Sequence, residues 1–252
     1  MKTAIITGAS SGLGREFARQ LTDIFPEIEC CWLIARREDR LEEIAREMVG
    51  VETVCLPLDL CDSMSFTTLQ EKLAAEKPEV AILINNAGCG YLGEVGQTET
   101  SLQTRMVDLN LRALTAITSL CIPYMQAGSR IINVSSIASF CPTPRMTVYS
   151  ATKAYVSAFT LGLSEELKKK GVTVTAVCPG PMETEFLDVG RISGNSRTFA
   201  MLPYCDQVRV AGGTLRAAKA GRTIYTPRLF YKTYRLLAKV TPAKLMMKLT
   251  KT

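Results

Sequence analysis

The chain has 252 residues, 47% of them hydrophobic and 21% charged, which suits one α/β domain with a sizeable core and excludes a disordered chain. It contains no histidine, which excludes Ser-His-Asp hydrolysis, dehydrogenases with a catalytic histidine and most zinc catalysis. We therefore expect no metal. The net charge of +6 is uneven, because residues 207–252 hold 11 Lys and Arg but no Asp or Glu.

Short apolar runs alternate with amphipathic stretches almost from end to end. The predicted strands are Thr3–Thr7, Cys30–Ala35, Thr53–Leu58, Val80–Asn85, Arg130–Ser135, Val172–Cys178 and Arg222–Tyr225. The predicted helices include Gly14–Phe25, Arg37–Val49, Ser63–Ala75, Leu102–Gln126 and Val148–Lys170. Strands that are apolar throughout are typical of a parallel sheet covered by helices on both faces. We therefore expect a single α/β domain over residues 1–252, with a Rossmann-like, doubly wound, mostly parallel seven-stranded sheet and a C-terminal helical tail.

The first strand leads into a glycine-rich turn and then directly into a helix. Glycines let the backbone approach a pyrophosphate, whose charge is stabilised by amides at the helix N-terminus. The spacing is G-x-x-x-G-x-G, which differs from the G-x-G-x-x-G of most dinucleotide folds. The residues that we expect to bind the cofactor here are Gly8, Ser10, Ser11, Gly12, Leu13 and Gly14.

The second strand ends at Ala35 and is followed by Arg36 and Arg37. Enzymes that use NAD place an acidic residue at this point, whereas guanidinium groups bind a 2′-phosphate. The two arginines therefore favour NADP(H), although a solvated charge run at a helix start is the alternative. After the third strand, Asp59 and Leu60 are predicted to contact the adenine, and a helix N-cap is the other interpretation of Asp59.

Ser136 follows the fifth strand, Tyr149 lies 13 residues further on, and Lys153 lies one helical turn beyond Tyr149. A nearby ammonium is expected to lower the pKa of a phenol towards the range useful for general acid/base catalysis. A serine hydroxyl can bind the substrate oxygen, and a nicotinamide supplies the hydride, so the reaction needs no metal.

Taken together, these motifs resemble those of the short-chain dehydrogenase/reductase family over roughly residues 3–226. The matching segments are 7–14, Asp59, 85–88, Asn110, Ser136, 149–153 and 179–184. The resemblance implies Tyr149 as acid/base, Lys153 on the phenol and the nicotinamide ribose, Ser136 on the carbonyl, and Asn110 holding a relay water. It also implies cofactor contacts from Asn86, Ala87, Gly88, Pro179, Gly180, Met182 and Thr184. Segment 35–41 resembles NADP(H)-preferring members, although Ser11 stands where many of them have a basic residue.

The substrate is predicted to be a lipophilic ketone, aldehyde or alcohol. Segments 89–92 and 140–146 and a lid at 184–202 are mostly apolar, although side chains such as Phe140 and Phe186 could equally pack the lid itself. The chain is interpreted as an NADPH-dependent reductase or dehydrogenase, and an NADP(H)-binding regulatory protein without turnover is the alternative.

The tail, 227–252, alternates aliphatic and basic residues around Pro242. It either packs on the body or on a second subunit, or lies on an anionic membrane surface and brings the enzyme to a lipid substrate. We expect no nucleic-acid partner, because the basic residues are interleaved with aliphatic ones that need burial. A homo-oligomer, dimer or tetramer, is expected from the resemblance.

The cysteines point to a reducing compartment. Cys30, Cys31, Cys55 and Cys178 lie in apolar, strand-like runs, and no pair has C-x-x-C spacing. A strand-like run begins at Thr3, and no apolar run reaches membrane-spanning length. We therefore expect a cytoplasmic protein without a signal peptide.

Overall fold

The structure is a computed structural model that describes residues 1–249, except for the side chains of residues 197, 198 and 249. Residues 250–252, the end of the predicted tail, lie outside the described residues.

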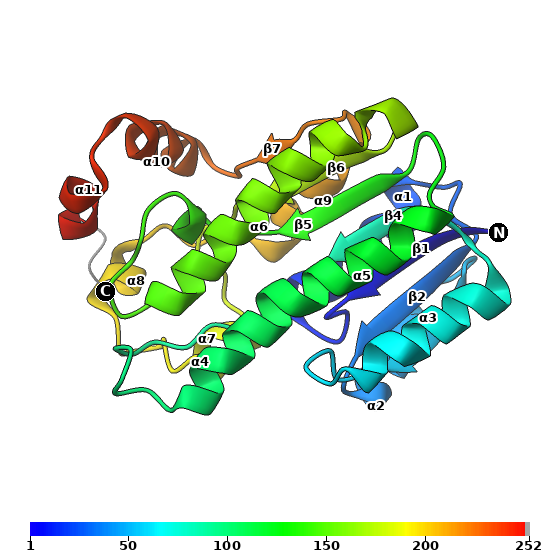
Figure 1. Cartoon of the computed structure of the whole chain (residues 1–252), viewed down its shortest axis with the longest axis horizontal. Coiled ribbons are helices and arrows are strands. Elements are labelled where there is room, and N and C mark those ends of the chain that lie inside the picture. Colours follow the sequence, from blue (N-terminus) through cyan, green and yellow to red (C-terminus); the bar gives the residue numbers. More distant parts are fainter. Residues whose placement is uncertain (250–252) are drawn as a thin grey trace.

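Seven parallel strands form one sheet in the order β3-β2-β1-β4-β5-β6-β7 (Figure 1). Their bounds are β1 Lys2–Thr7, β2 Cys30–Ala35, β3 Glu52–Pro57, β4 Glu79–Asn85, β5 Arg130–Val134, β6 Thr173–Val177 and β7 Ile224–Tyr225. The order reverses between β1 and β4, and ligands of doubly wound folds bind outside the carboxyl ends of the strands at such a point. The predicted sheet is thus confirmed, and it is entirely rather than mostly parallel.

Helices cover both faces of the sheet (Figure 1). One face carries α1 (Gly12–Ile24), α2 (Glu38–Glu47) and α9 (Gln207–Lys219), and the other carries α3 (Met64–Glu76), α5 (Leu114–Cys121) and α6 (Thr147–Glu166). Each face has its own apolar core: Phe17, Leu21 and Leu215 lie in the first, and Trp32, Ile117 and Leu163 in the second. This two-sided burial explains why the strands are apolar throughout.

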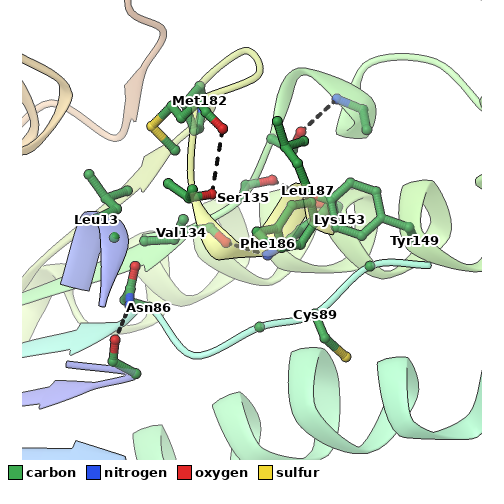
Figure 2. A pocket seen from close by; sticks show the side chains of 18 of the residues that line it. Leu13, Asn86, Cys89, Val134, Ser135, Tyr149, Lys153, Met182, Phe186 and Leu187 are labelled. Atoms are coloured by element: carbon green, nitrogen blue, oxygen red, sulfur yellow. Dashed lines mark hydrogen bonds between the residues drawn. The ribbon is translucent and has the colours of Figure 1, made fainter. Parts of the chain in front are cut away.

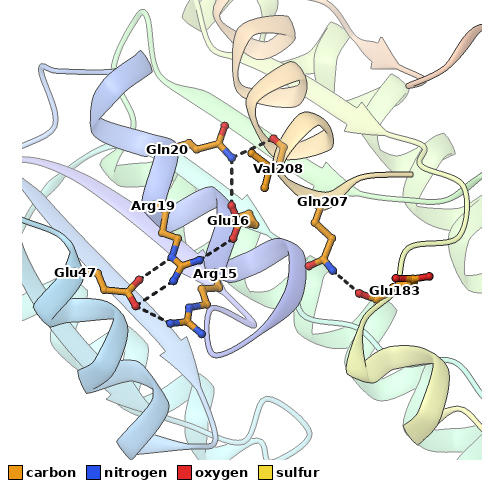
Figure 3. Close-up of polar contacts among 8 residues, drawn as sticks. All are labelled: Arg15, Glu16, Arg19, Gln20, Glu47, Glu183, Gln207 and Val208. Carbon is orange, nitrogen blue, oxygen red and sulfur yellow. Dashed lines mark hydrogen bonds and ion pairs between the residues drawn. The ribbon is translucent and has the colours of Figure 1, made fainter. Parts of the chain in front are cut away.

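On the first face, a cluster of charges joins α1 to α2. Glu47 accepts hydrogen bonds from Arg15 at 2.6 Å and from Arg19 at 2.7 Å (Figure 3). Arg19 also reaches Glu16 on its own helix, at 3.1 Å. The two arginines hold the carboxylate in its charged form, and the pKa of Glu47 falls to about 2, chiefly through its hydrogen bond with Arg19.

The predicted helix over 102–126 consists of four successive segments. These are α4 (Thr100–Val107), a π-helical turn η1 (Asp108–Ala113), α5, and a 3-10 turn η2 (Ile122–Tyr124). A π-helical turn within an α-helix is often found at a functional site. A second 3-10 turn, η3 (Ile137–Ser139), follows β5, and a third, η4 (Lys168–Lys170), follows α6.

Helix α9 was not predicted, because Gly212 and Gly213 lower its helical propensity. In the structure they allow close packing: a Cβ at Gly212 would lie 2.5 Å from Oε1 of Gln20 on α1, and one at Gly213 would overlap the hydroxyl of Tyr225 on β7.

The rest of the chain lies beyond the carboxyl edge of the sheet. The predicted lid contains two short helices, α7 (Glu185–Val189) and α8 (Arg197–Met201), and the tail forms α10 (Leu229–Val240) and α11 (Ala243–Leu249) at one end of the molecule (Figure 1). Within residues 1–249 no helix combines the length and the apolar character needed to cross a bilayer.

Candidate active site

The glycine-rich turn after β1 is joined to the turn after β4 by Asn86. The Asn86 side chain donates hydrogen bonds to the carbonyl oxygens of Thr7 and Gly8, both at 3.0 Å, while the Thr7 hydroxyl accepts from the backbone of Asn86 and Ala87. Gly8 has φ +64° and a Cβ there would lie 2.8 Å from the Cα of Ala87, so only glycine fits. Gly14 lets α1 approach the carbonyl of Gly8 closely, and it lies behind the turn rather than at its surface.

The N-terminus of α1 is suited to an anion. Its N-cap, Ser11, makes no side-chain hydrogen bond to the first amides, and the first turn contains no acidic residue. Such amides carry a partial positive charge and bind phosphate groups. Ser10, Ser11, Gly12 and Leu13 line the cavity at this point. The residues present therefore fit the pyrophosphate of a dinucleotide.

Arg36 and Arg37 also line the cavity, at the end of β2, but they have different surroundings. Arg36 is exposed. Arg37 donates to the hydroxyl of Ser10 at 3.3 Å and forms an ion pair of 2.8 Å with Glu185, the first residue of α7. The predicted phosphate-binding arginine thus already has an acidic partner, which sequence reasoning missed.

Asp59 does not cap a helix, so that interpretation is wrong. Its Oδ1 accepts from the backbone of Cys61 at 3.0 Å, and its Oδ2 lies 3.6 Å from Arg105. Burial favours protonation of Asp59, but the Cys61 amide and the charges of Arg105 and Arg36 outweigh it and lower the pKa. Asp59 and Leu60 both line the cavity beside Arg36.

Ser136, Tyr149 and Lys153 come together at the carboxyl edge of the sheet. The Ser136 hydroxyl accepts from the backbone of Ala138 at 3.1 Å, and it also forms a hydrogen bond with the Tyr149 phenol. Lys153 donates to the carbonyl of Val134 at 2.8 Å, and its Nζ lies 5.8 Å from the centroid of the Tyr149 ring. All three side chains are buried and line the cavity, so the structure brings together what the sequence predicted.

Burial dominates the ionisation of this pair. It raises the pKa of the Tyr149 phenol to about 12, although the hydrogen bond with Ser136 acts in the opposite direction. It also lowers the pKa of Lys153 to about 8. The predicted lowering of the Tyr149 pKa is therefore not found in this chain, because lost hydration of the phenolate outweighs the hydrogen bond with Ser136. At neutral pH the phenol is protonated and most Lys153 side chains are charged.

Asn110 lies in the π-helical turn η1, behind the cavity wall. Its Oδ1 accepts from the backbone N–H of Cys89 at 2.9 Å, and its Nδ2 donates to the Cys89 carbonyl at 2.8 Å and to Thr152 at 3.0 Å. Both ends of the amide thus hold the segment after β4 against α6. The Asn110 amide thus binds backbone groups, which is a structural role that needs no water. Its role in holding a relay water stays a prediction.

The cavity extends from the glycine-rich turn past Tyr149 to the lid and the tail, with a volume of about 730 Å³. Ala87 and Gly88 line it near the turn, and Pro179, Met182 and Thr184 line it near Tyr149. Figure 2 shows Phe186 and Lys153 beside Tyr149, with Leu13 and Asn86 at the other end of the view.

Phe186 from α7 lies against Tyr149. The two ring centroids are 5.6 Å apart. Gly90 permits this, because a Cβ there would lie 2.6 Å from the Phe186 ring and 2.8 Å from the Tyr149 ring. The predicted lid segment is therefore a wall of the cavity. Phe140, predicted to line the substrate pocket, is not among its lining residues but faces Tyr234 of the tail, with 6.1 Å between the ring centroids.

The tail is also part of this wall. Tyr231 of α10 is fully buried, its hydroxyl donates to the carbonyl of Pro203 at 2.7 Å, and its ring fills the space where a Cβ of Gly180 would be. Gly180 thus lines the cavity and also provides the space into which Tyr231 of the tail packs. Tyr231 and Glu185 were missed by sequence reasoning, since neither stands in a motif. Gly180 was predicted as a cofactor contact, and nothing in the sequence indicated that it also makes room for Tyr231.

Comparisons with known proteins agree with this geometry. The short chain dehydrogenase family matches residues 2–191. A sulfoacetaldehyde reductase of Chromohalobacter salexigens is 36% identical over 189 residues, which cover 72% of this chain and 73% of the relative.

Two solved structures are similar over most of their length. A short-chain dehydrogenase from Sphingobium yanoikuyae in complex with NADPH is 26% identical with a TM-score of 0.80, covering 96% of this chain and 97% of the other. The bulky-bulky ketone specific alcohol dehydrogenase from Comamonas testosteroni is 27% identical with a TM-score of 0.77, covering 98% and 94%. Structures with this fold include complexes with NADPH and with NAD. The family match and the arrangement of Ser136, Tyr149 and Lys153 lead to one conclusion: the chain belongs to the short-chain dehydrogenase/reductase family of oxidoreductases.

Proposed function

We propose that the chain is an NADPH-dependent reductase that converts a ketone or aldehyde on a lipophilic small molecule into an alcohol. The observation that carries this proposal is the position of Tyr149, buried beside Lys153 in the same cavity that begins at the glycine-rich turn. When bound, the nicotinamide supplies the hydride.

The remaining steps belong to the side chains. When a substrate is bound, the Ser136 hydroxyl donates to the substrate oxygen and stabilises the negative charge that develops there. Tyr149 gives its proton to the same oxygen, which completes the alcohol. The protonated phenol, with a pKa of about 12 in this chain, is the form required for reduction. Lys153 stabilises the phenolate left behind through its charge.

The end of β2 supports NADPH. It carries Arg36 and Arg37 and no acidic residue, and both arginines line the cavity. The solved NADPH complex of the similar Sphingobium protein agrees with this preference.

The wall around Tyr149 supports a lipophilic substrate. Its lid and tail side chains are almost all apolar or aromatic: Phe186, Leu187, Val189, Phe199, Leu202, Phe230, Tyr234, Leu237 and Met246. Burying apolar surface is worth roughly 25 cal/mol per Å², so such a wall favours bulky carbonyl compounds over small polar ones. The similarity to an alcohol dehydrogenase specific for bulky ketones points the same way.

The test is to offer the enzyme a panel of aliphatic, aromatic and steroid-like carbonyl compounds and to measure turnover of each as oxidation of NADPH. Tyr149→Phe should lower kcat about 10²- to 10⁴-fold, the range for loss of a general acid. Tyr155→Phe is a matched control, because Tyr155 lies on the same helix and binds the Thr115 hydroxyl at 2.8 Å, away from the cavity. Full activity in Tyr149→Phe removes the mechanism. NADPH binding with no turnover on any compound favours a regulatory protein instead.

The outer face of the tail supports a second proposal, peripheral contact with an anionic membrane. Six apolar side chains of the tail are more than half exposed: Leu229, Phe230, Leu236, Leu237, Val240 and Leu245. They alternate with exposed basic residues such as Lys232 and Lys239, with no acidic residue among them. Phe230 and Leu237 belong both to this face and to the cavity wall, so a lipid substrate could enter directly from a bilayer.

Co-sedimentation with phosphatidylcholine vesicles, with and without phosphatidylserine, tests this contact. The chain should pellet only with the anionic vesicles, and Lys239→Glu should reduce the pelleted fraction. Lys169→Glu makes the same charge change in η4, which follows α6, and should have no effect. Absence of pelleting removes the membrane proposal, and a dimer that Lys239→Glu dissociates would assign the face to a second subunit.

A further inference from the structure

Glu185 stands opposite the arginines at the end of β2. Its Oε2 lies 2.8 Å from Arg37 Nη2, and its Oε1 lies 3.6 Å from Arg40 Nη1. Arg37 is at the same time bound to Ser10 of the glycine-rich turn, at 3.3 Å. The guanidinium of Arg37 is therefore shared between the cofactor-binding turn and the first residue of α7.

The ion pair is accessible and ionised. The Arg37 and Glu185 side chains are 41% and 47% exposed. The hydrogen bond from Arg37 lowers the pKa of Glu185, so Glu185 is a carboxylate at neutral pH. Pairs with this exposure are weak and are readily exchanged for a stronger partner. A 2′-phosphate is such a partner, because its dianion binds guanidinium more strongly than one carboxylate does.

We propose that Glu185 is a specificity-determining residue for the cofactor, which restrains the preference for NADP(H) by competing with the 2′-phosphate for Arg37. NAD(H) has a hydroxyl at this position and leaves the Arg37–Glu185 pair intact. NADP(H) must either displace the carboxylate or bind beside its negative charge. This inference rests on the proposed use of NADPH.

The same chain contains a matched control. Glu183 lies two residues earlier in the same segment and is exposed, and its carboxylate makes no ion pair with any residue of the described part of the chain. Its backbone carbonyl accepts a hydrogen bond from Gln207 (Figure 3), which a change of side chain leaves in place. Glu185→Gln and Glu183→Gln therefore remove the same charge from neighbouring positions, and only the first removes it from Arg37.

The experiment measures dissociation constants for NADPH and NADH by fluorescence titration, without substrate. In Glu185→Gln, NADPH should bind about threefold to tenfold more tightly than in the wild type, the range that half-exposed charge pairs permit. Binding of NADH should be unchanged, and Glu183→Gln should match the wild type for both. Because the effect is electrostatic, the gain should shrink in 0.5 M salt, where the screening length falls to roughly 4 Å.

An Arg37→Ala variant separates the two proposals. If the wild type prefers NADPH and Arg37→Ala loses that preference, but Glu185→Gln equals the wild type, the role of Glu185 is overturned and NADPH use stands. If the wild type prefers NADPH and Arg37→Ala keeps that preference, the role of Glu185 is overturned and NADPH use stands. If the wild type binds NADPH and NADH equally well and Arg37→Ala does not change that, both proposals fail. Equal changes for the two nucleotides in Glu185→Gln, unaffected by salt, reveal a structural role of the residue and overturn the specificity role.

Discussion

Replacing Tyr231 with alanine should detach the tail from the body. The ring is fully buried against Gly180, and its hydroxyl donates to the carbonyl of Pro203 at 2.7 Å. Removal of a buried aromatic side chain costs about 3–5 kcal/mol, and a carbonyl left without its partner adds about 1 kcal/mol. Tyr231→Phe removes the hydroxyl alone and should cost only about 1 kcal/mol.

The loss should be mainly local. Tyr231 reaches the first core, but it does so alone among the described side chains of α10 and α11, and the two helices themselves lie at the edge of the molecule (Figure 1). The tail can open while the sheet stays folded, so its opening energy is smaller than that of global unfolding. Amide hydrogen exchange in α10 should accelerate about 10²-fold or more in Tyr231→Ala, and about fivefold in Tyr231→Phe. Exchange in β1 and β4 should be unchanged.

The reasoning is refuted if α10 keeps its protection in Tyr231→Ala while the chain remains folded. It is also refuted if α10 and the sheet lose protection together, because the tail would then be part of one cooperative unit. Gly180→Ala provides an independent check, since its methyl group would overlap the Tyr231 ring and should expose α10 in the same way.

Three further outcomes are expected. Exchanging both Arg36 and Arg37 for alanine should raise the dissociation constant of NADPH far more than that of NADH, measured by titration; equal losses contradict the phosphate assignment. The kcat/KM for carbonyl reduction should fall above about pH 8, where Lys153 loses the charge that stabilises the phenolate, and a profile that stays flat to pH 10 would argue against this role. Glu47→Gln should destabilise the fold by roughly 0.5–1 kcal/mol at pH 7, given the partial exposure of its ion pairs. Because folding lowers the Glu47 pKa from 4.5 to about 2, this difference in unfolding free energy should disappear as the pH falls through that interval, and a pH-independent difference would disprove the electrostatic origin.

Much of the site was predictable because its residues follow strand ends. Gly8, Asn86 and Ser136 each stand just after a strand, and parallel strands bring their carboxyl ends to one edge of the sheet. Tyr149 and Lys153 are one helical turn apart, so a helix alone places them together. The spacing and residue types along the chain were sufficient for these positions.

Other features depended on contacts between distant segments. The raised pKa of Tyr149 comes from the burial of its ring beneath Phe186 and the lid, and no local pattern contains that information. The π-helical turn at Asn110 exists where the side chain binds the backbone of Cys89, 21 residues away. Helix α9 was missed because its glycines are explained only by the neighbours that they approach.

The amino-acid sequence by itself determined the parallel sheet, the glycine-rich turn and the pairing of Tyr149 with Lys153, since periodicity and short-range spacing are properties of consecutive residues. Tertiary structure alone decided that Glu185 meets Arg37 and that Tyr231 seats the tail on Gly180, because these partners are 148 and 51 residues apart and come from elements whose positions depend on the packed sheet. Such contacts depend on which segments the fold brings together, and the spacing of residues along the chain does not show this.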